Sequence, residues 1–422
     1  MDKSFLNSPA GMKSLLPKNA RRFRAIKQEI DDVFSVWGYS PIITPIFEYY
    51  DSLMVGMGES TKKEFYKFID YEGDILALRP EMTAPIARTI VNRREEFSLP
   101  LRLYYDAPVY RYDSPQMGKN REIYQMGIEF IGEKSSLADA EAIIIAVEAI
   151  KKTGIEDFKI DLGHTGFLEG MIRELGLEDK EAEIKRHLNK KDFVGLKNFI
   201  NTLSVSGRDV LHKLPLLRGG RDVLKRAEDL VENKKSAAAI DKLRTVYEYL
   251  DHYHLADYIN FDLGLIRGLN YYTGLVFEGF TDKLGYTICG GGRYDNLIEK
   301  YGGEKIPAVG FAVGLERIRL ALLKHQKEFA ENTVDGMSVF PSGSRERAFR
   351  VTRRLHRKGY TVILEENGEV NEQLLNKAKK LKVNKILSFF PVGDIIEVVD
   401  VESGEKEEVQ TDEGWEERIW KN

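Results

Sequence analysis

Near the start of the chain, apolar residues recur every three or four positions. Phe23, Ile26, Ile30 and Phe34 fall on one face of a helix that we predict over residues 18–36. A proline precedes this stretch, where it suits the entrance of a helix. The pattern is typical of an amphipathic helix.

Short apolar runs typical of strands follow this helix. Two pairs of runs flank polar stretches and predict hairpins, the second with a long basic tip. A stretch rich in isoleucine and proline cannot be helical, so we expect an extended segment at a sheet edge. The predicted elements are this extended segment, the two hairpins and one further helix, over residues 39–48, 64–70 with 75–79, 101–111 with 122–131, and 83–93.

The middle of the chain, residues 136–258, changes in character. Leucine, lysine, glutamate and alanine dominate it, and we predict a mostly helical insertion. Strand signals rich in aromatic residues and glycine return at 260–279 and 286–292, and the apolar spacing of 308–323 predicts a helix. The sheet-forming segments are thus split around the insertion, within one core domain over residues 1–325.

The last part of the chain, residues 335–422, alternates between strand and helix patterns. This alternation predicts a small C-terminal α/β domain. The charged run after Val401 predicts a hairpin or a solvated tail. The alternating strands and helices are predicted over residues 338–340, 346–358, 361–364, 371–381 and 385–389.

Composition and charge narrow the functional classes. The 422 residues include 63 Lys and Arg against 67 Asp and Glu, a formal net charge of -4, so bulk charge gives no support for nucleic-acid binding. The single cysteine, Cys289, can neither close an internal disulfide nor build a cysteine-rich zinc site. We find no signal peptide and no apolar run long enough to span a bilayer. We therefore predict a cytoplasmic protein without a membrane role.

Several charged side chains stand on segments that otherwise predict strands. Gln125 and Glu129 share one side of a strand, where they can hold an ammonium group or form a satisfied polar pair in the core. The stretch 290–292 (GGG) is either a phosphate cradle or a close backbone approach. His252 and His254 face different sides of a helix, which argues against a metal site. The remaining charged set is Arg79, Glu81, Arg111, Arg121, Arg267 and Arg317.

Three blocks of the chain resemble, in order, the signature motifs of class II aminoacyl-tRNA synthetases. They are residues 38–48 (GYSPIITPIFE), 110–132 (YRYDSPQMGKNREIYQMGIEFIG) and 310–317 (GFAVGLER). The segments 78–83 (LRPEMT) and 266–272 (IRGLNYY) are similar to the histidine-binding segments of histidyl-tRNA synthetases. This resemblance implies an α+β fold, in which an antiparallel sheet is flanked by helices and motif 1 forms a homodimer interface.

The same resemblance implies roles for individual residues. It places a histidine-binding site beside a set of arginines that face the phosphates of ATP. The histidine site would comprise Glu81, Thr83, Gln125, Glu129, Arg267, Tyr271 and Tyr272. The ATP-facing set would comprise Arg111, Arg121 and Arg317.

A second family with this fold resembles the sequence more closely. It comprises the regulatory subunits of ATP phosphoribosyltransferase, which pair with a short catalytic subunit at the first step of histidine biosynthesis. Residues 78–88 (LRPEMTAPIAR) and 158–166 (FKIDLGHTG) resemble blocks of that family. Asp113, Ser114 and Asn270 stand where synthetases usually carry Glu, Arg and Asp. These departures remove charges that the synthetase reaction uses.

The second resemblance implies a non-catalytic subunit that confers feedback control by histidine. It implies no catalytic residue, metal or cofactor, and it makes the ATP-facing arginines vestigial. The implied partners are the short catalytic subunit, histidine and a second copy of the chain. Two alternatives stay open: an active histidyl-tRNA synthetase, which the retained Arg111, Arg267 and Arg317 favour, and an amino-acid-binding protein with another partner.

Overall fold

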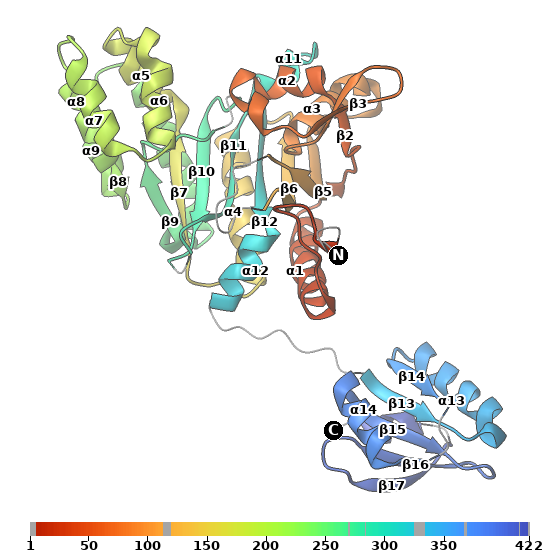
Figure 1. Cartoon of the computed structure of the whole chain (residues 1–422). Helices are drawn as coiled ribbons and strands as arrows, with labels where there is room; N and C mark the ends of the chain where they lie inside the picture. The colour runs from red at the N-terminus through yellow and green to blue at the C-terminus, as the bar shows by residue number, and fades with distance from the viewer. Residues whose placement is uncertain are drawn as a thin grey trace. The chain divides into compact units, whose positions relative to one another are not determined.

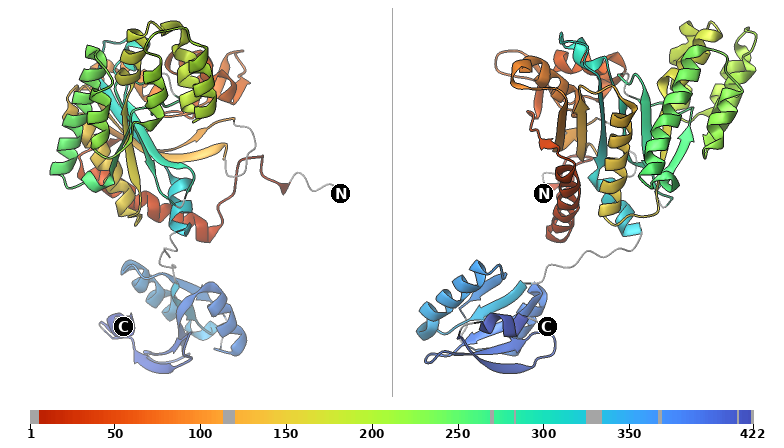
Figure 2. Two further views of the ribbon diagram at one scale, coloured as in Figure 1. Left: turned by 90° about the vertical axis from the view of Figure 1, so that its left-hand side faces the viewer. Right: turned by 180° about the vertical axis from the view of Figure 1, so that it is seen from behind.

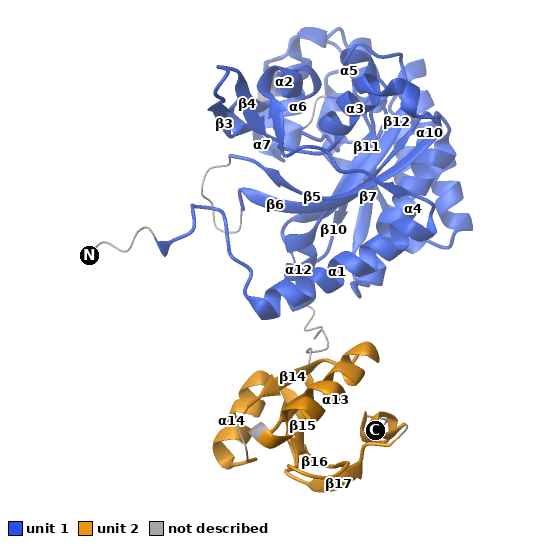
Figure 3. Ribbon diagram, turned by 90° about the vertical axis from the view of Figure 1, so that its right-hand side faces the viewer, with its two compact units in different colours: residues 1–328 blue, residues 329–422 orange. Residues whose placement is uncertain are grey.

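The chain divides into two compact units, residues 1–328 and 329–422 (Figure 3). The structure is a computed structural model, and it describes residues 6–112, 120–268, 271–282, 284–324, 334–366, 369–412 and 414–420. Each unit has its own sheet and its own buried apolar clusters. The two units are therefore described separately.

A nine-stranded sheet forms the centre of the first unit (Figure 1). Its strands in chain order are β1 (Ser40–Pro41), β5 (Leu101–Tyr110), β6 (Glu122–Ile131), β7 (Lys159–His164), β8 (Arg218–Gly219), β9 (Ile259–Asp262), β10 (Leu275–Phe280), β11 (Thr287–Arg293) and β12 (Ala308–Gly314). Across the sheet they follow the order β1-β5-β6-β12-β11-β10-β7-β9-β8. The pairs β1–β5 and β7–β9 are parallel and the others are antiparallel. The predicted α+β fold is confirmed, and the sheet is antiparallel except at these two pairs.

Helices cover one face of this sheet. They are α1 (Pro17–Val36), α4 (Ser136–Lys152), α10 (Lys234–His252) and α12 (Leu315–Lys324). Helix α1 runs beside α4 (Figure 2) and buries Phe23, Ile26, Ile30 and Phe34. The amphipathic helix predicted from these four positions is confirmed.

The opposite face of the sheet carries a smaller layer. Helix α3 (Thr83–Asn92) packs Ile86 and Ile90 against β5 and β6, together with the short helix α11 (Leu297–Lys300). Beside it lie α2 (Tyr50–Met57) and a three-stranded sheet of β2 (Phe47–Tyr49), β4 (Ile75–Leu78) and β3 (Lys67–Ile69). The edge segment and both hairpins predicted for this part of the chain are confirmed.

Residues 136–258 are helical apart from β7 and β8, and β7 is a strand of the main sheet. After β7 the helices α5 (Thr165–Glu174), α6 (Glu181–Asn189), α7 (Phe193–Thr202), α8 (Asp209–Lys213) and α9 (Asp222–Glu228) gather near β8 (Figure 1). We call residues 181–228, which hold α6 to α9, the helical subdomain. The subdomain is thus joined to the sheet at the edge formed by β7, β9 and β8.

One predicted helix is wrong. Residues 308–314, assigned to a helix from their apolar spacing, form β12 in the middle of the sheet, and only α12 after them is helical. Both faces of β12 are covered, so nearly all its side chains are apolar and buried. A short run in which every residue is apolar shows no periodicity, so its pattern cannot distinguish a buried strand from a helix.

The second unit is a five-stranded sheet in the order β14-β13-β15-β16-β17. Its elements are β13 (Val334–Val339), α13 (Arg345–Arg357), β14 (Val362–Glu365), α14 (Glu372–Leu381), β15 (Val383–Phe389), β16 (Ile395–Asp400), β17 (Lys406–Gln410) and α15 (Trp415–Trp420). Helices α13 and α15 bury apolar residues in one cluster and α14 in another. The predicted strand–helix alternation is confirmed, and the charged run after Val401 completes a hairpin between β16 and β17.

Candidate functional site

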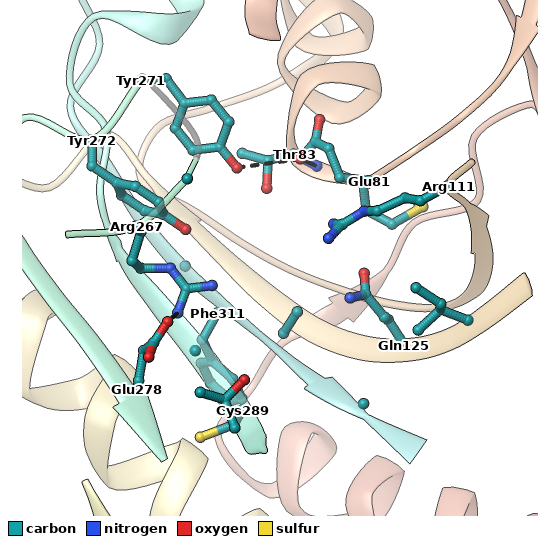
Figure 4. A pocket seen from close by; sticks show the side chains of 18 of the residues that line it. Glu81, Thr83, Arg111, Gln125, Arg267, Tyr271, Tyr272, Glu278, Cys289 and Phe311 are labelled. Carbon is teal, nitrogen blue, oxygen red and sulfur yellow. Dashed lines mark hydrogen bonds and ion pairs between the residues drawn. The ribbon is translucent and has the colours of Figure 1, made fainter. Parts of the chain in front are cut away.

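A cavity of about 320 Å³ opens on the face of the main sheet that carries α3. Strands β6, β10, β11 and β12 form its base, and the start of α3 and the segment before β10 form its walls. Arg111 and Gln125 extend into the cavity from one side, and Arg267 and Tyr272 extend from the other (Figure 4). Eight of the predicted residues line it: Glu81, Thr83, Arg111, Gln125, Arg267, Tyr271, Tyr272 and Arg317.

The wall beside α3 contains two buried carboxylates. Glu81 is 3% exposed and accepts the backbone N–H groups of Thr83 and Ala84, at 2.8 and 2.6 Å. It also accepts the hydroxyl of Tyr271 at 3.3 Å. Burial raises the pKa of Glu81, although the backbone donors at the helix N-terminus oppose this shift. Glu81 thus fixes the first turn of α3 and orients Tyr271 at the cavity edge.

The second carboxylate, Glu129 on β6, lies beneath this wall. It is 1% exposed and accepts the Thr83 hydroxyl at 2.7 Å and the hydroxyl of Tyr294. Burial raises the pKa of Glu129 to about 8, and the hydroxyl donors only partly offset the effect. Gly310 makes room for it, because a methyl group there would lie 2.0 Å from Oε2. The carboxyl is therefore held one hydroxyl away from the cavity.

The opposite wall carries arginines. Arg267 donates through Nη1 to the carbonyl oxygen of Phe277 at 3.1 Å and to Oε1 of Glu278 at 3.2 Å. Its Nε is buried and makes no hydrogen bond with the described residues. Gly290 makes room for the guanidinium, because a methyl group there would overlap Nη1 at 1.8 Å. Arg267 is thus anchored at one nitrogen and retains donors for a ligand.

Two further arginines add positive charge to the cavity. Arg111 donates through Nε to the carbonyl oxygen of Pro80 at 2.8 Å. Arg317 donates through Nη1 to the carbonyl and hydroxyl oxygens of Thr287, at 2.6 and 2.7 Å. Burial lowers the pKa of Arg317, and the charges of Arg111 and Arg267 add to the effect. Mutual repulsion of this kind favours an anion between the three groups.

Aromatic rings complete the cavity. The rings of Tyr271 and Tyr272 lie 4.9 Å apart, and Tyr271 also contacts Tyr294 at 5.7 Å. The guanidinium of Arg267 lies 5.6 Å from the ring centre of Tyr272. An amphoteric ligand with a flat ring therefore finds buried acceptors, free donors and aromatic surface in one place.

A model of the histidyl-tRNA synthetase family matches residues 11–318. The chain is 51% identical to an ATP phosphoribosyltransferase regulatory subunit of Halothermothrix orenii over 403 residues, which are 95% of this chain and 96% of the relative. It is 40% identical to the regulatory subunit of Desulforamulus reducens, covering 84% of this chain and 88% of the relative.

The chain belongs to the family of ATP phosphoribosyltransferase regulatory subunits.

Solved structures agree with this family. A Bacillus halodurans protein described as an ATP phosphoribosyltransferase regulatory subunit/histidyl-tRNA synthetase is 31% identical, with a TM-score of 0.81 and coverage of 90% of this chain and 97% of the other. The histidyl-tRNA synthetase of Nostoc sp. PCC 7120 has a TM-score of 0.82 at 24% identity, over 98% of each chain, and shows the shared fold. The predicted resemblance to regulatory subunits of this fold is confirmed.

Two of the predicted site residues do not line the cavity of this regulatory-subunit homologue. Glu129 lies beneath it, as described above. Arg121 is held elsewhere: its guanidinium lies 4.4 Å from the ring of Tyr112, and its backbone N–H donates to the carbonyl of Gly11 at 2.8 Å. Arg121 does not line the cavity, because the N-terminal segment packs against its side chain, and its place in the ATP-facing set stays a prediction. Asp113, Ser114 and Asn270 lie outside the described residues.

Sequence reasoning missed three residues of this regulatory-subunit site: Glu278, Tyr294 and Tyr105. Glu278 and Tyr105 line the cavity, and Tyr294 both lines it and bonds Glu129. Glu278 carries a charge on a strand in the middle of the sheet, which is the signal that singled out Arg267 and its neighbours. Tyr294 lies in a block shared by both related families, so the comparison of motifs gave it no weight.

Metal-ligating groups, the single cysteine and apolar helices are the remaining features of the described residues. These residues contain no group of three or more His, Cys, Asp and Glu side chains placed to hold a metal ion. Cys289 lines the cavity, and burial raises the pKa of its thiol to about 12, so it stays protonated. No helix in the described ranges combines the length and apolar character needed to cross a membrane.

Proposed function

We propose that this chain is the non-catalytic, histidine-binding regulatory subunit of a hetero-oligomeric ATP phosphoribosyltransferase, and that it confers feedback inhibition by histidine on the first step of histidine biosynthesis. It would act in the cytoplasm with the short catalytic subunit, and without nucleic acid or a membrane. The observation that carries the proposal is the cavity, which joins buried carboxylates and partly free arginines in a chain of this family.

The cavity suits the three groups of free histidine. We place the ammonium group near Gln125 and Thr83, where the positive charge of the ligand would favour ionisation of Glu129 behind the Thr83 hydroxyl. The carboxylate would meet Arg267, whose Nε has no partner among the described residues. The imidazole would lie against Tyr271 and Tyr272, consistent with the preference of flat rings for aromatic surface.

The size of the cavity favours an amino acid over an amino acid with a nucleotide. At about 320 Å³ it lies at the lower end of the roughly 300 to 1,000 Å³ that small-molecule sites span. Arg121 lies outside it, against the ring of Tyr112. We therefore propose that Arg111, Arg121 and Arg317 are remnants of an ATP site and that none of them is catalytic.

Self-association is supported by an exposed apolar sheet face. Phe47, Tyr49 and Phe68 are 54%, 59% and 37% exposed, and strand register places them on one side of the β2-β4-β3 sheet. The rings of Phe47 and Phe68 lie 4.9 Å apart. Contiguous exposed apolar side chains of this kind mark association surfaces. We propose that a second copy of the chain covers this face.

The alternative function is an active histidyl-tRNA synthetase. The family model over residues 11–318 and the three arginines that line the cavity favour it. The charges lost at Ser114 and Asn270 oppose it, because each preorganised donor or charge missing from such a site lowers turnover by about two orders of magnitude.

Two assays on one preparation separate the functions. The purified chain is mixed with the short catalytic subunit and followed by size-exclusion chromatography and by the rate of phosphoribosyl-ATP formation, with and without histidine. We expect a larger co-eluting species, a faster reaction and inhibition by histidine. In parallel, the chain alone is assayed for charging of histidine tRNA. Charging at ordinary enzyme rates, with no effect on the catalytic subunit, would establish the synthetase instead.

A further inference from the structure

The sheet face that carries the cavity continues past it as a row of charged side chains. Strand register places Gly290 on β11, Glu278 on β10 and Asp161 on β7 opposite one another. Side chains of directly opposite residues share a face, with Cβ atoms roughly 5 Å apart, so the carboxylates of Glu278 and Asp161 are neighbours. Each has its own arginine: Arg267 Nη1 lies 3.2 Å from Glu278, and Arg218 Nη2 lies 2.5 Å from Asp161.

The two arginines belong to different parts of the first unit. Arg267 lines the cavity, whereas Arg218 lies on β8 within the helical subdomain. Asp161 is 2% exposed, and its carboxylate forms an ion pair with Arg218. Arg218 also approaches Asp262 with its Nε at 3.7 Å, and its carbonyl accepts from Arg226 on α9 at 3.4 Å. The row, with two adjacent carboxylates between two arginines, therefore runs from the cavity wall to the base of α9.

The segment that carries Arg267 also packs on the subdomain directly. A methyl group added at Gly268 would lie 3.5 Å from the side-chain amide of Asn189, at the end of α6. One added at Gly264 would lie 3.7 Å from Leu188. A change at the cavity wall thus has a short path to the helical subdomain.

We propose that the row Arg267–Glu278–Asp161–Arg218 couples occupancy of the cavity to the helical subdomain, with Arg218 as the positioning residue. The inference rests on the proposed function, since it takes histidine as the ligand. When a ligand carboxylate pairs with Arg267, the positive charge of Arg267 offsets less of the negative charge of Glu278. The carboxylates of Glu278 and Asp161 then repel each other more strongly. Arg218 then holds Asp161 more tightly, and this favours the arrangement of β8 and α9 seen here.

Removing the charge of Arg218 tests the coupling at the far end of the row. In Arg218→Met we expect histidine to bind about fivefold more weakly by calorimetry, at the lower end of typical couplings between sites. Arg218→Lys retains the charge and should recover most of the affinity. The matched control is Arg93→Met, which removes an arginine that pairs with Glu96 at 2.9 Å, outside both the row and the helical subdomain. It should leave the affinity unchanged.

A mutant cycle distinguishes coupling from a loss of local structure. In a Glu278→Gln background the repulsion that Arg218 compensates is gone, so Arg218→Met should change the affinity by less than about twofold. Hydrogen exchange supplies the second readout. Histidine should slow exchange in residues 181–228 of the unmodified protein, and Arg218→Met should remove this protection while histidine stays bound at saturation.

Unchanged affinity and unchanged protection in Arg218→Met would overturn the inference, and so would an equal loss of affinity with and without Glu278→Gln. Both results leave the proposed function intact, because the unmodified protein still binds histidine. Absence of histidine binding by the unmodified protein would instead contradict the proposed function together with this inference.

Discussion

The two walls of the cavity differ in the charged side chains that they carry and in the partners of those side chains. Beside α3, the carboxyls of Glu81 and Glu129 are buried, and the hydrogen bonds described for them come from neutral donors, namely backbone N–H groups and hydroxyls. Across the cavity, Arg267 and Arg317 are anchored by protein oxygens at one nitrogen each. The two carboxyls of the first wall accept no hydrogen bond from a cation, although the nearby charge of Arg111 opposes the rise that burial causes in the pKa of Glu81, and the second wall retains donors for an anion.

This difference indicates how a zwitterion would be oriented. A buried carboxyl without a cation has a raised pKa, and it gains most when a ligand brings positive charge. An arginine that is held by protein oxygens at one nitrogen still carries its positive charge. Its guanidinium is already oriented, so it binds a carboxylate with preorganised geometry. The ammonium end should therefore point to α3 and the carboxylate end to β10, as in the proposed histidine complex.

The largest expected effect comes from the carboxyl beneath the first wall. Glu129→Gln removes the carboxyl that would ionise to balance the ligand ammonium, and we expect histidine to bind about 3 kcal/mol more weakly, roughly a hundredfold. The control is Glu122→Gln on the same strand, whose side chain faces the other side of the sheet and bonds Tyr110. Equal calorimetric affinity in Glu129→Gln and Glu122→Gln would place histidine elsewhere.

The second wall should be the next most sensitive. Arg267→Met removes the donors for the ligand carboxylate, and loss of a charged hydrogen bond should weaken binding by about 2 kcal/mol. Histidinamide, which lacks the carboxylate charge, should bind the variant and the unmodified protein with similar affinity. A similar loss for both ligands would show that Arg267 supports the fold of the wall and does not meet the carboxylate.

The pH dependence of stability tests the first wall without a ligand. A carboxyl whose pKa is raised on folding, here Glu129 to about 8, stabilises the fold below its unfolded pKa and loses that contribution as pH rises through 8. Between pH 6 and 7 the free energy of unfolding should therefore fall by about 1.4 kcal/mol more in the unmodified protein than in Glu129→Gln. Parallel urea-unfolding profiles for the two proteins would mean that Glu129 is ionised in the fold.

The smallest effect should come from the partner of Arg267. Glu278→Gln removes the ion pair of the Arg267 guanidinium. The Arg267 side chain is 20% exposed, so solvent partly screens the attraction between the two side chains. Histidine should bind more tightly by less than about 1 kcal/mol. Weaker binding in this variant would show that Glu278 positions Arg267 more than it competes for it.

Much of the fold follows from local patterns in the sequence. The helix through Phe23 and Phe34 has a clear period of 3.6 residues, and β5 alternates between buried and more exposed positions along most of its length. Strands β7 and β12 were missed for two physical reasons. Strand β12 is apolar on both faces and has no period, and β7 is six residues long within a stretch rich in helix-forming residues.

The candidate site was less predictable than the fold. The motifs led to Glu81, Gln125 and Arg267, because such side chains on a buried sheet need a partner or a function. They could not show that Glu129 lies one hydroxyl below the cavity or that Arg121 packs on the N-terminal segment. Those facts depend on contacts between segments far apart in the sequence, which spacing along the chain does not encode.

The most direct test of the central claim is histidine inhibition of the assembled enzyme. The short catalytic subunit is combined with the unmodified chain or with Glu129→Gln, assembly is verified by co-elution, and phosphoribosyl-ATP formation is titrated with histidine. We predict equal uninhibited rates, and inhibition of the variant complex only at histidine concentrations roughly a hundredfold higher. Inhibition of both complexes over the same histidine range would contradict the claim that this cavity receives the regulatory histidine.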